Sequence, residues 1–182
     1  KVGASTLREA LTLLVGEALV TAEGQRGFRV APISLADFED IIRVRKLMEL
    51  EALRESIRLG DDEWEAQVVA AFHRLTKVEE QLKNGDAKTL SGEWEERNRA
   101  FHDALISACP SRWLTHFIDI LYQQSERYRR IALAGKAVGR DVHAEHEAIK
   151  NAALARDIGE AVRLSEIHID RTFEVLSRMF DS

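Results

Sequence analysis

The sequence predicts an all-α fold: a six-helix antiparallel bundle that follows a short helix and a two-stranded β-ribbon. The chain has 182 residues, of which 45% are hydrophobic and 31% are charged, and it contains only 2 Pro. This composition supports a packed core and excludes collagen-like, low-complexity and disordered classes. From residue 35 onward, apolar residues recur at helical spacing with almost no strand signal. Short breaks separate these stretches, and short connections favour antiparallel neighbours in a bundle.

The N-terminal part of the chain predicts a helix and a ribbon. Apolar residues at helical spacing indicate a helix over residues 5–15, with Ser5 as its N-cap. Two β-type runs, residues 19–22 and 27–31, flank a turn-rich tip. A helix followed by such a ribbon is the second half of a winged helix-turn-helix. We therefore assign residues 1–31, here called the head, to the C-terminal part of a winged helix-turn-helix domain, with a helix first and the β-ribbon after it.

A tight linker, residues 32–36, separates the head from a helical domain of residues 37–182. Ser34 or Asp37 can cap the first helix of this domain. Breaks that contain Gly, Pro or Asp divide the rest of the chain into six helical stretches. Their predicted bounds are 35–58, 62–83, 90–108, 111–134, 138–156 and 158–180.

Charge, hydropathy and cysteine content limit the class of protein. No apolar run approaches the ~18 residues of a membrane helix, and the N-terminus has no signal-peptide core. Cys109 is the single cysteine, which fits a reducing compartment, so we expect a cytoplasmic protein with no membrane partner. The net charge is −5, yet the head holds four basic and three acidic residues. A polyanion partner is therefore expected to meet the head.

Three histidines are predicted to point into the bundle interior. His102, with Asn98 four residues before it, lies on the apolar face of its helix, and His146 and His168 lie on the inward faces of later helices. Imidazoles on facing helices suit zinc, nickel and related divalent ions, and three of them leave room for an oxygen ligand or a small acid. The alternative is that they hydrogen-bond to neighbours and bind no metal. The other three histidines, His73, His116 and His143, are interpreted as ordinary surface or partly buried residues.

Arg45 has two interpretations. It can form an i,i+4 ion pair with Glu49 on a solvated face, or it can reach into the bundle and grip a ligand carboxylate with both guanidinium donors. The run 126–130 is typical of a solvated helix face, but one of its arginines could supplement the pocket, and Arg127 is the one predicted to do so. The acidic pair Glu95-Glu96 is assigned to the surface.

No sequence motif points to catalysis. The chain contains no nucleophile elbow, Walker loop, dinucleotide fingerprint or HExxH helix. A metal held by three histidines could nevertheless activate water, so a hydrolase or an oxygenase stays open as an alternative.

Three segments of the head resemble the recognition helix and wing of GntR-type bacterial transcription regulators. These segments are residues 5–11, 18–20 and 25–31. The rest of the chain resembles the all-helical effector domain of the FadR subfamily, the FCD domain. Its signature pieces here are Arg45–Glu49, Phe101-His102, Glu145–Ile149 and His168. The resemblance implies a homodimeric, ligand-responsive regulator, most often a repressor, which binds double-stranded operator DNA and responds to a small carboxylate effector.

The resemblance also implies roles for individual residues. The expected DNA-binding residues are Ser5, Thr6, Arg8, Gln25 and Arg26. The expected ligands of a divalent metal ion, zinc or nickel, are Asn98, His102, His146 and His168. Asn98 stands where the family commonly has Asp, and Ala4 stands where it commonly has a DNA-contacting Arg. The expected effector-binding residues are Arg45 and Arg127.

Family members begin with two further helices, so the resemblance implies that this chain is a fragment that starts just before the recognition helix. The leading prediction is a ligand-responsive, DNA-binding transcription regulator rather than an enzyme. Two alternatives from other classes are a metal-dependent enzyme acting on a small organic acid and a non-sensing helical dimerisation module whose histidines are structural.

Overall fold

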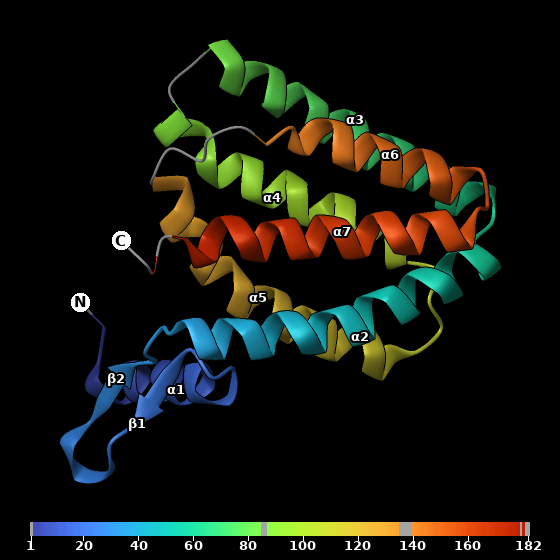
Figure 1. Cartoon of the computed structure of the whole chain (residues 1–182). Helices are drawn as coiled ribbons and strands as arrows, with labels where there is room; N and C mark the ends of the chain where they lie inside the picture. The colour runs from blue at the N-terminus through green and yellow to red at the C-terminus, as the bar shows by residue number, and fades with distance from the viewer. Residues whose placement is uncertain (1, 85–86, 135–139, 179, 181–182) are drawn as a thin grey trace.

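The computed structural model describes residues 2–84, 87–134, 140–178 and 180, and it confirms the predicted all-α architecture. Seven α-helices and one two-stranded sheet occupy this described part of the chain (Figure 1). In chain order the elements are α1 (Ala4–Gly16), β1 (Val20–Ala22), β2 (Phe28–Val30), α2 (Leu35–Leu59), α3 (Asp62–Asn84), α4 (Ala87–Ile106), α5 (Arg112–Ala134), α6 (Val142–Leu154) and α7 (Ile158–Ser177). The head projects from one end of the six-helix domain.

The head consists of α1 and an antiparallel ribbon in which Val20 pairs with Val30. A single 3₁₀ turn, Gly24–Arg26, forms the tip of the ribbon. Gly27, which follows this turn, has a φ of +100°, a conformation that residues with a Cβ rarely adopt. The ribbon therefore depends on glycine at this corner.

The predicted N-cap of α1 is wrong. The helix begins at Ala4 with Gly3 as its N-cap, and Gly3 makes no side-chain capping bond. The amide of Leu7 already donates to the carbonyl of Gly3, so Ser5 lies inside the first turn, where it cannot cap the helix. None of the residues of α1 is buried.

The six-helix domain is arranged around its first helix. Ser34 caps α2, because its side chain accepts a hydrogen bond from the amide of Asp37 at 3.1 Å. α2 packs on α5 and α7, α3 packs on α4 and α6, and α6 packs on α7. Asp141 caps α6, which explains why this helix begins at Val142 rather than at the predicted residue 138. The predicted breaks at residues 85–86 and 135–139 lie outside the described residues.

Two main hydrophobic clusters fill the described part of the domain, and a third, small one consists of Ala52, Cys109 and Ile118. The larger main cluster joins α2, α3, α4, α6 and α7, and its most buried side chains include Ile57, Leu75, Phe101 and Ile149. The smaller main cluster joins α2, α5 and α7 near the linker, where Phe38 stacks on Tyr128 with 4.4 Å between ring centroids. The first cluster contacts the histidines of the interior through Phe101, whose ring lies 5.2 Å from that of His146.

Candidate metal and effector site

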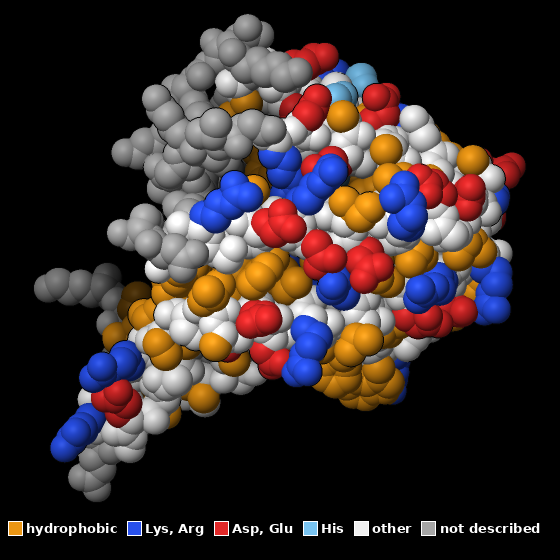
Figure 2. All heavy atoms as spheres, in the orientation of Figure 1, with side chains coloured by type: hydrophobic (Ala, Val, Ile, Leu, Met, Phe, Trp, Pro, Cys, Tyr) orange, Lys and Arg blue, Asp and Glu red, His pale blue; other side chains and the backbone are white. Residues whose placement is uncertain are grey.

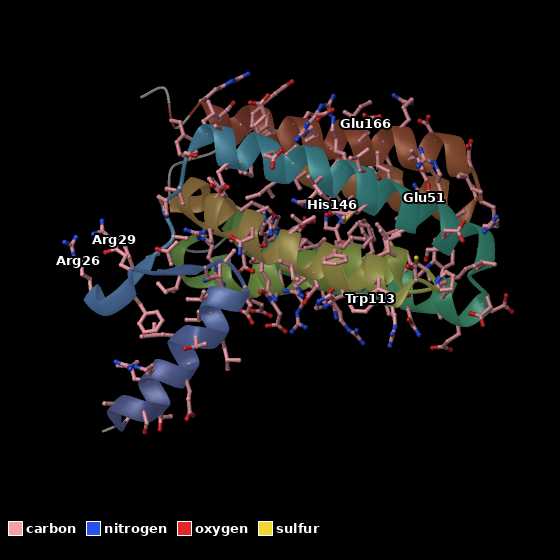
Figure 3. The ribbon with its side chains drawn as sticks, turned by 90° about the horizontal axis from the view of Figure 1, so that it is seen from below. Arg26, Arg29, Glu51, Trp113, His146 and Glu166 are labelled. Atoms are coloured by element: carbon pink, nitrogen blue, oxygen red, sulfur yellow. The ribbon has the colours of Figure 1, made fainter. Side chains whose placement is uncertain are left out.

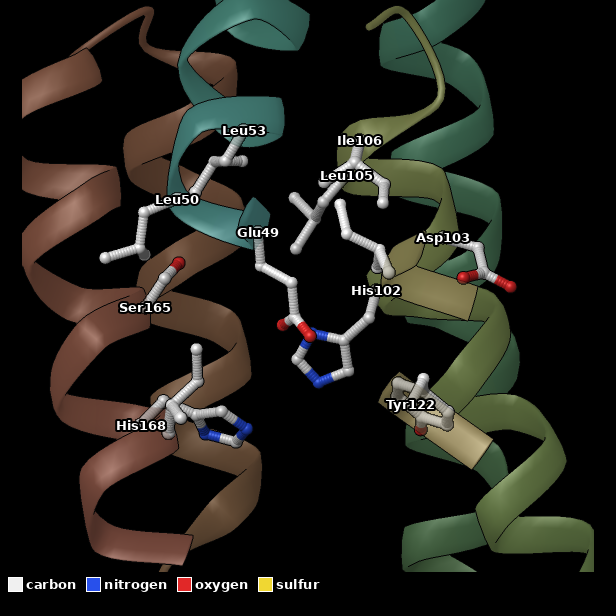
Figure 4. Close-up of a pocket in the computed structure, with 12 residues that line it drawn as sticks. Glu49, Leu50, Leu53, His102, Asp103, Leu105, Ile106, Tyr122, Ser165 and His168 are labelled. Atoms are coloured by element: carbon white, nitrogen blue, oxygen red, sulfur yellow. The ribbon is translucent and has the colours of Figure 1, made fainter. Parts of the chain in front are cut away.

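The three histidines predicted to face inward meet in the middle of the bundle. The rings of His146 and His168 lie 4.7 Å apart, and the ring of His102 lies 5.2 and 5.3 Å from them. One nitrogen from each ring can be chosen so that all three lie within 4.8 Å of one another. Figure 3 shows His146 in the core of the bundle, and Figure 4 shows His102 and His168 from facing helices.

The environment keeps these imidazoles neutral. Burial, together with the neighbouring His146 and His168, holds the pKa of His102 well below its ordinary value. Burial likewise lowers the pKa of His168 to about 3, and it lowers the pKa of His146. Neutral imidazole is the form that binds a metal ion, so at physiological pH the three histidines can bind one without first losing a proton.

Two carboxylates lie beside two of the rings, the half-buried Glu145 and the buried Glu79. Glu145 lies 2.8 Å from Nδ1 of His168, and Glu79 lies 3.7 Å from Nδ1 of His146. Burial raises the pKa of Glu145, but hydrogen bonds from His168 and Arg140 outweigh this effect and hold that pKa well below its usual range. The hydrogen bond at Nδ1 of His168 leaves its Nε2 for the shared centre, as is usual for metal-binding histidines, whereas both ring nitrogens of His146 are without a hydrogen-bond partner.

His143 is partly buried, as predicted, but the prediction did not include its contact with Glu79. His143 is part of the same network, because its Nδ1 lies 2.6 Å from Glu79. Burial raises the pKa of Glu79, but hydrogen bonds from His146 and His143 lower it by more, so Glu79 stays ionised.

Asn98, predicted as the fourth ligand, has a side-chain oxygen that no other group of the described residues contacts by a hydrogen bond. It is buried, and its Nδ2 donates to the hydroxyl of Tyr122 at 2.9 Å, which leaves Oδ1 as the atom available to a ligand. Asn98 Oδ1 and His146 Nε2 are both buried without a hydrogen-bond partner. Buried polar atoms rarely stay unpaired, so these atoms indicate a polar occupant.

The donor set suits a divalent transition metal. Three imidazole nitrogens and an amide oxygen form a ligand set that zinc and nickel accept. Two ligands of a tetrahedral ion, each about 2.1 Å from it, lie about 3.4 Å apart, so the nitrogens would need to close by up to about 1.4 Å from the 4.8 Å observed. Metal binding therefore requires the side chains to move.

A small cavity adjoins the histidines (Figure 4). Leucine and isoleucine are half of the residues that line it, and the polar groups at its edge include Glu49, His102, Tyr122 and His168. Its volume is about 30 Å³, which accommodates a water molecule or two. An organic acid would therefore require Glu49 or another wall residue to move.

Arg45 combines its two predicted interpretations. It forms a two-bonded ion pair with Glu49, at 2.6 and 3.1 Å, as the i,i+4 spacing predicts. The pair is not on a solvated face, however, because Arg45 is only 5% exposed and its Nη1 donates to Ser125 at 2.9 Å. Arg45 thus lies inside the bundle behind Glu49, which itself borders the cavity.

The structure does not bring Arg127 to the cavity. Arg127 instead donates to the carbonyl of Ala31 in the head and to Gln124. Arg129 is the arginine of this run that turns inward, because it lies seven residues after Tyr122 and shares its helix face.

The assignment of Glu95 to the surface is also wrong. Glu95 is 3% exposed and accepts a hydrogen bond from Nε of Arg129 at 3.0 Å. Arg129 in addition donates to Ser125, the hydroxyl that Arg45 also contacts. The polar spacing of Tyr122, Ser125 and Arg129 along one face is a sequence signal that could have identified this network.

The expected DNA-binding residues lie on the head. Ser5, Thr6 and Arg8 are exposed on α1, and Arg26 is exposed at the tip of the ribbon. The side chain of Gln25 lies outside the described part of the structure. Figure 3 shows Arg26 and Arg29 projecting from the ribbon, and Figure 2 shows basic side chains at the tip of the head beside an acidic one. Arg29 pairs with Glu23 at 2.7 Å.

Among the helices that the structure describes, none combines the length and the apolar character needed to cross a membrane.

Comparisons with known proteins agree with this architecture. Residues 40–171 match the family model of the FCD domain. The "Uncharacterized HTH-type transcriptional regulator BphR" of Paraburkholderia xenovorans (strain LB400) is 46% identical over 176 residues, which are 97% of this chain and 71% of that protein. The "HTH-type transcriptional repressor GlaR" of Escherichia coli (strain K12) is 38% identical over 171 residues, covering 92% of this chain and 76% of that protein.

A solved structure is similar over nearly the whole chain. The crystal structure of a GntR family member from Pseudomonas syringae pv. tomato str. DC3000 has a TM-score of 0.68 and 26% sequence identity, and the match covers 97% of this chain and 70% of that one. These relatives are transcriptional regulators, not enzymes, which removes the metal-dependent enzyme as an alternative. The chain belongs to the FCD-domain family, within the GntR-type, DNA-binding transcription regulators.

Proposed function

We propose that the helical domain senses a small carboxylate through a divalent metal ion and thereby controls operator binding by a homodimer that acts as a repressor. One observation supports this proposal most directly. Three neutral imidazoles converge at the edge of a cavity, two of them buried, and the buried Oδ1 of Asn98, one helical turn before His102, has no hydrogen-bond partner. The neutral ring nitrogens would donate their lone pairs to a cation. The positive charge of that cation would then attract an anionic ligand.

In this proposal His102, His146, His168 and Asn98 hold the metal. When bound, the ion supplies a positive centre that attracts a carboxylate oxygen. Glu145 and Glu79 keep His168 and His146 oriented and place negative charge near the cation.

Arg45 is the second anchor for the ligand. Glu49 now holds the guanidinium of Arg45 and also borders the cavity. A ligand carboxylate would take over one or both of these hydrogen bonds, while displacement of Glu49 enlarges the cavity. Arg127 has no place in this proposal, because its guanidinium contacts the head.

The head supplies the DNA contacts. Arg8 on α1 and Arg26 at the tip of the wing would reach phosphates or guanine edges of the operator. Operator half-sites are two-fold related, so two heads in a homodimer would read one operator.

Metal analysis followed by ligand titration tests the proposal. Protein purified without a metal column and offered Zn²⁺ or Ni²⁺ should bind one ion per chain, and His146→Ala should abolish this binding. Metal-loaded protein should then bind small carboxylates in calorimetry more tightly than the metal-free form, and Arg45→Gln should weaken that binding. Protein that binds far less than one ion per chain would refute the metal centre and favour the non-sensing dimerisation module.

A further inference from the structure

Helix α5 contacts both the head and the polar network of the bundle. In the described part of the chain, both hydrogen bonds between the head and the helical domain start from α5: Gln124 donates to the carbonyl of Glu17, and Arg127 donates to the carbonyl of Ala31. Tyr128, on the same side of α5, accepts a hydrogen bond from the amide of Ser34 in the linker at 3.4 Å.

These three side chains occupy one face of α5. Gln124, Arg127 and Tyr128 are spaced i, i+3 and i+4, which places them together on a helix surface. Gln124 and Tyr128 are buried, so the head and the linker rest on α5 rather than extend freely from it. Tyr128 also donates to Asp37 at 2.6 Å and stacks on Phe38, which fixes the start of α2 against the same surface.

A different face of α5 points to the histidines. Tyr122 borders the cavity, and its hydroxyl bonds to Asn98 and Glu95 at 2.9 and 3.3 Å. Ser125 and Arg129 continue this face with hydrogen bonds to Arg45 and Glu95. Both faces belong to one continuous α-helix, so a rotation or shift forced on the inner face moves the outer face by a similar amount.

We propose that α5 transmits occupancy of the metal and effector site to the head, with Gln124 and Arg127 as the residues that position the head. The inference rests on the proposed function, because it describes how that site would act on DNA binding. A change at Asn98 or Arg45 reaches Tyr122 and Ser125 directly, and the same helix then carries it to the carbonyls of Glu17 and Ala31.

Hydrogen exchange of the head measures this coupling in the chain itself. Gln124→Ala combined with Arg127→Ala should speed exchange in peptides covering residues 17–34 by roughly tenfold, the change expected for losing two hydrogen bonds of ordinary net strength. Arg130→Ala is the matched control, because Arg130 is an exposed arginine of the same helix that pairs with Glu126. It should leave this exchange unchanged. Equal exchange in the double variant and the parent overturns the proposal.

A double-mutant cycle tests the link to the inner face without any ligand. Tyr122→Phe removes the hydroxyl that contacts Asn98 and Glu95, so it should alter exchange of residues 17–34 in the parent but not in the Gln124→Ala/Arg127→Ala background. Ser125→Ala serves as a second inner-face variant if Tyr122→Phe does not fold. Equal effects in both backgrounds, or no effect in the parent, would contradict transmission through α5.

A third experiment tests whether occupancy of the site changes the head, and it uses Zn²⁺ alone as the ligand. Zn²⁺ should alter exchange of the head in the parent and leave the double variant unaffected, although both bind the ion. Zn²⁺ binding that changes the head equally in both proteins, or in neither, overturns the proposal. Absence of Zn²⁺ binding to the parent refutes the proposed metal centre instead, and the ligand-free cycle still decides whether α5 couples the two sites.

Discussion

Asn98 is the residue whose substitution is expected to change the affinity of the proposed metal centre most directly. Its side chain offers a neutral oxygen where the proposed cation needs charge compensation, and that oxygen is buried and unpaired. Negative charge near the histidines comes instead from carboxylates such as Glu145, which contacts His168, and Glu49, which lines the same cavity as His102 and His168. The centre is therefore expected to bind metal more weakly than one with a carboxylate in this position.

Asn98→Asp should raise the affinity for Zn²⁺ by at least about tenfold, since a charged oxygen ligand replaces a neutral one. Competition titration with a chelating dye measures the change. Asn98→Ala is the matched control and should lower the affinity. An Asp variant with unchanged or lower affinity would show that Asn98 does not face the ion.

The pH dependence of stability follows from the histidines. In metal-free protein the folded state keeps them neutral, with the pKa of His168 at about 3, whereas the unfolded chain protonates them near 6.5. Below pH 6.5 the unfolded state therefore binds more protons, so stability is full above that pH and is lost as the pH falls. Glu79 and Glu145 add losses only below about 4.5, their ordinary pKa.

Between pH 6.5 and 4.5 the metal-free protein should lose up to about 1.4 kcal/mol per pH unit for each of these histidines. Urea denaturation in the presence of a chelator measures this slope. His168→Gln should reduce it, and saturating Zn²⁺ should raise stability throughout the range, because the ion binds the folded state. A slope of zero in the metal-free protein would mean that the histidines are not held neutral.

Among the helices, the corner between α2 and α3 depends on close approach of the backbone to an aromatic ring. A Cβ at Gly60 would lie 2.5 Å from the indole of Trp64. Trp64 is 3% exposed and belongs to the larger hydrophobic cluster, and Arg156 lies over its ring at 4.8 Å. The indole therefore has no room to move away.

Gly60→Ala should destabilise the protein by about 1–3 kcal/mol, the usual cost of overpacking. Gly92→Ala is the matched control. A Cβ added at Gly92, within α4, would meet no atom within 4 Å, so this change should stabilise by about 0.5–1 kcal/mol through helix propensity. Equilibrium denaturation compares the two variants, and equal stabilities would disprove the packing argument at Gly60.

At the scale of the whole molecule, we propose that the head makes the DNA contacts. Arg8 is exposed on α1 and does not support the core, so its removal opens no cavity. Arg8→Ala should weaken operator binding by about 2–6 kcal/mol, because a two-fold dimer loses a contact of about 1–3 kcal/mol twice. Gel-shift titration beside a thermal melt measures both effects.

The control for this prediction is Arg43→Ala, which removes an exposed arginine of α2 that pairs with Asp40. It should leave operator binding close to that of the parent. If Arg8→Ala keeps full affinity, or if it loses affinity and its melting transition together, Arg8 does not contact DNA.

The helical domain is also expected to form the homodimer. Large apolar side chains remain exposed on it, including Leu47 at 72% and Trp113 at 59%, and the ring of Trp113 lies 6.1 Å from that of the exposed Phe117. Contiguous exposed apolar groups are typical of interfaces. Light scattering at micromolar concentration should report twice the mass of 20.6 kDa. Removal of residues 1–31 should not alter this result, and a stable monomer would contradict the prediction.

Local sequence patterns were sufficient to predict the order and type of the elements and the inward direction of three histidines. Both are local properties: the spacing of apolar residues sets the helix period, and His102, His146 and His168 lie on the resulting apolar faces. The same spacing predicted the pair of Arg45 with Glu49, since i,i+4 neighbours meet on any helix.

Which polar residues surround these histidines depends instead on how the helices pack. Arg127 and Arg129 are two residues apart in one charged run of α5. The head packs on one side of α5, where Arg127 contacts it, and α4 packs on another side, where Arg129 contacts Glu95. Glu79 reaches His146 only because α3 packs on α6. Periodicity fixes a side chain's direction on its own helix, but its partner depends on which helix lies opposite, and long-range packing determines that.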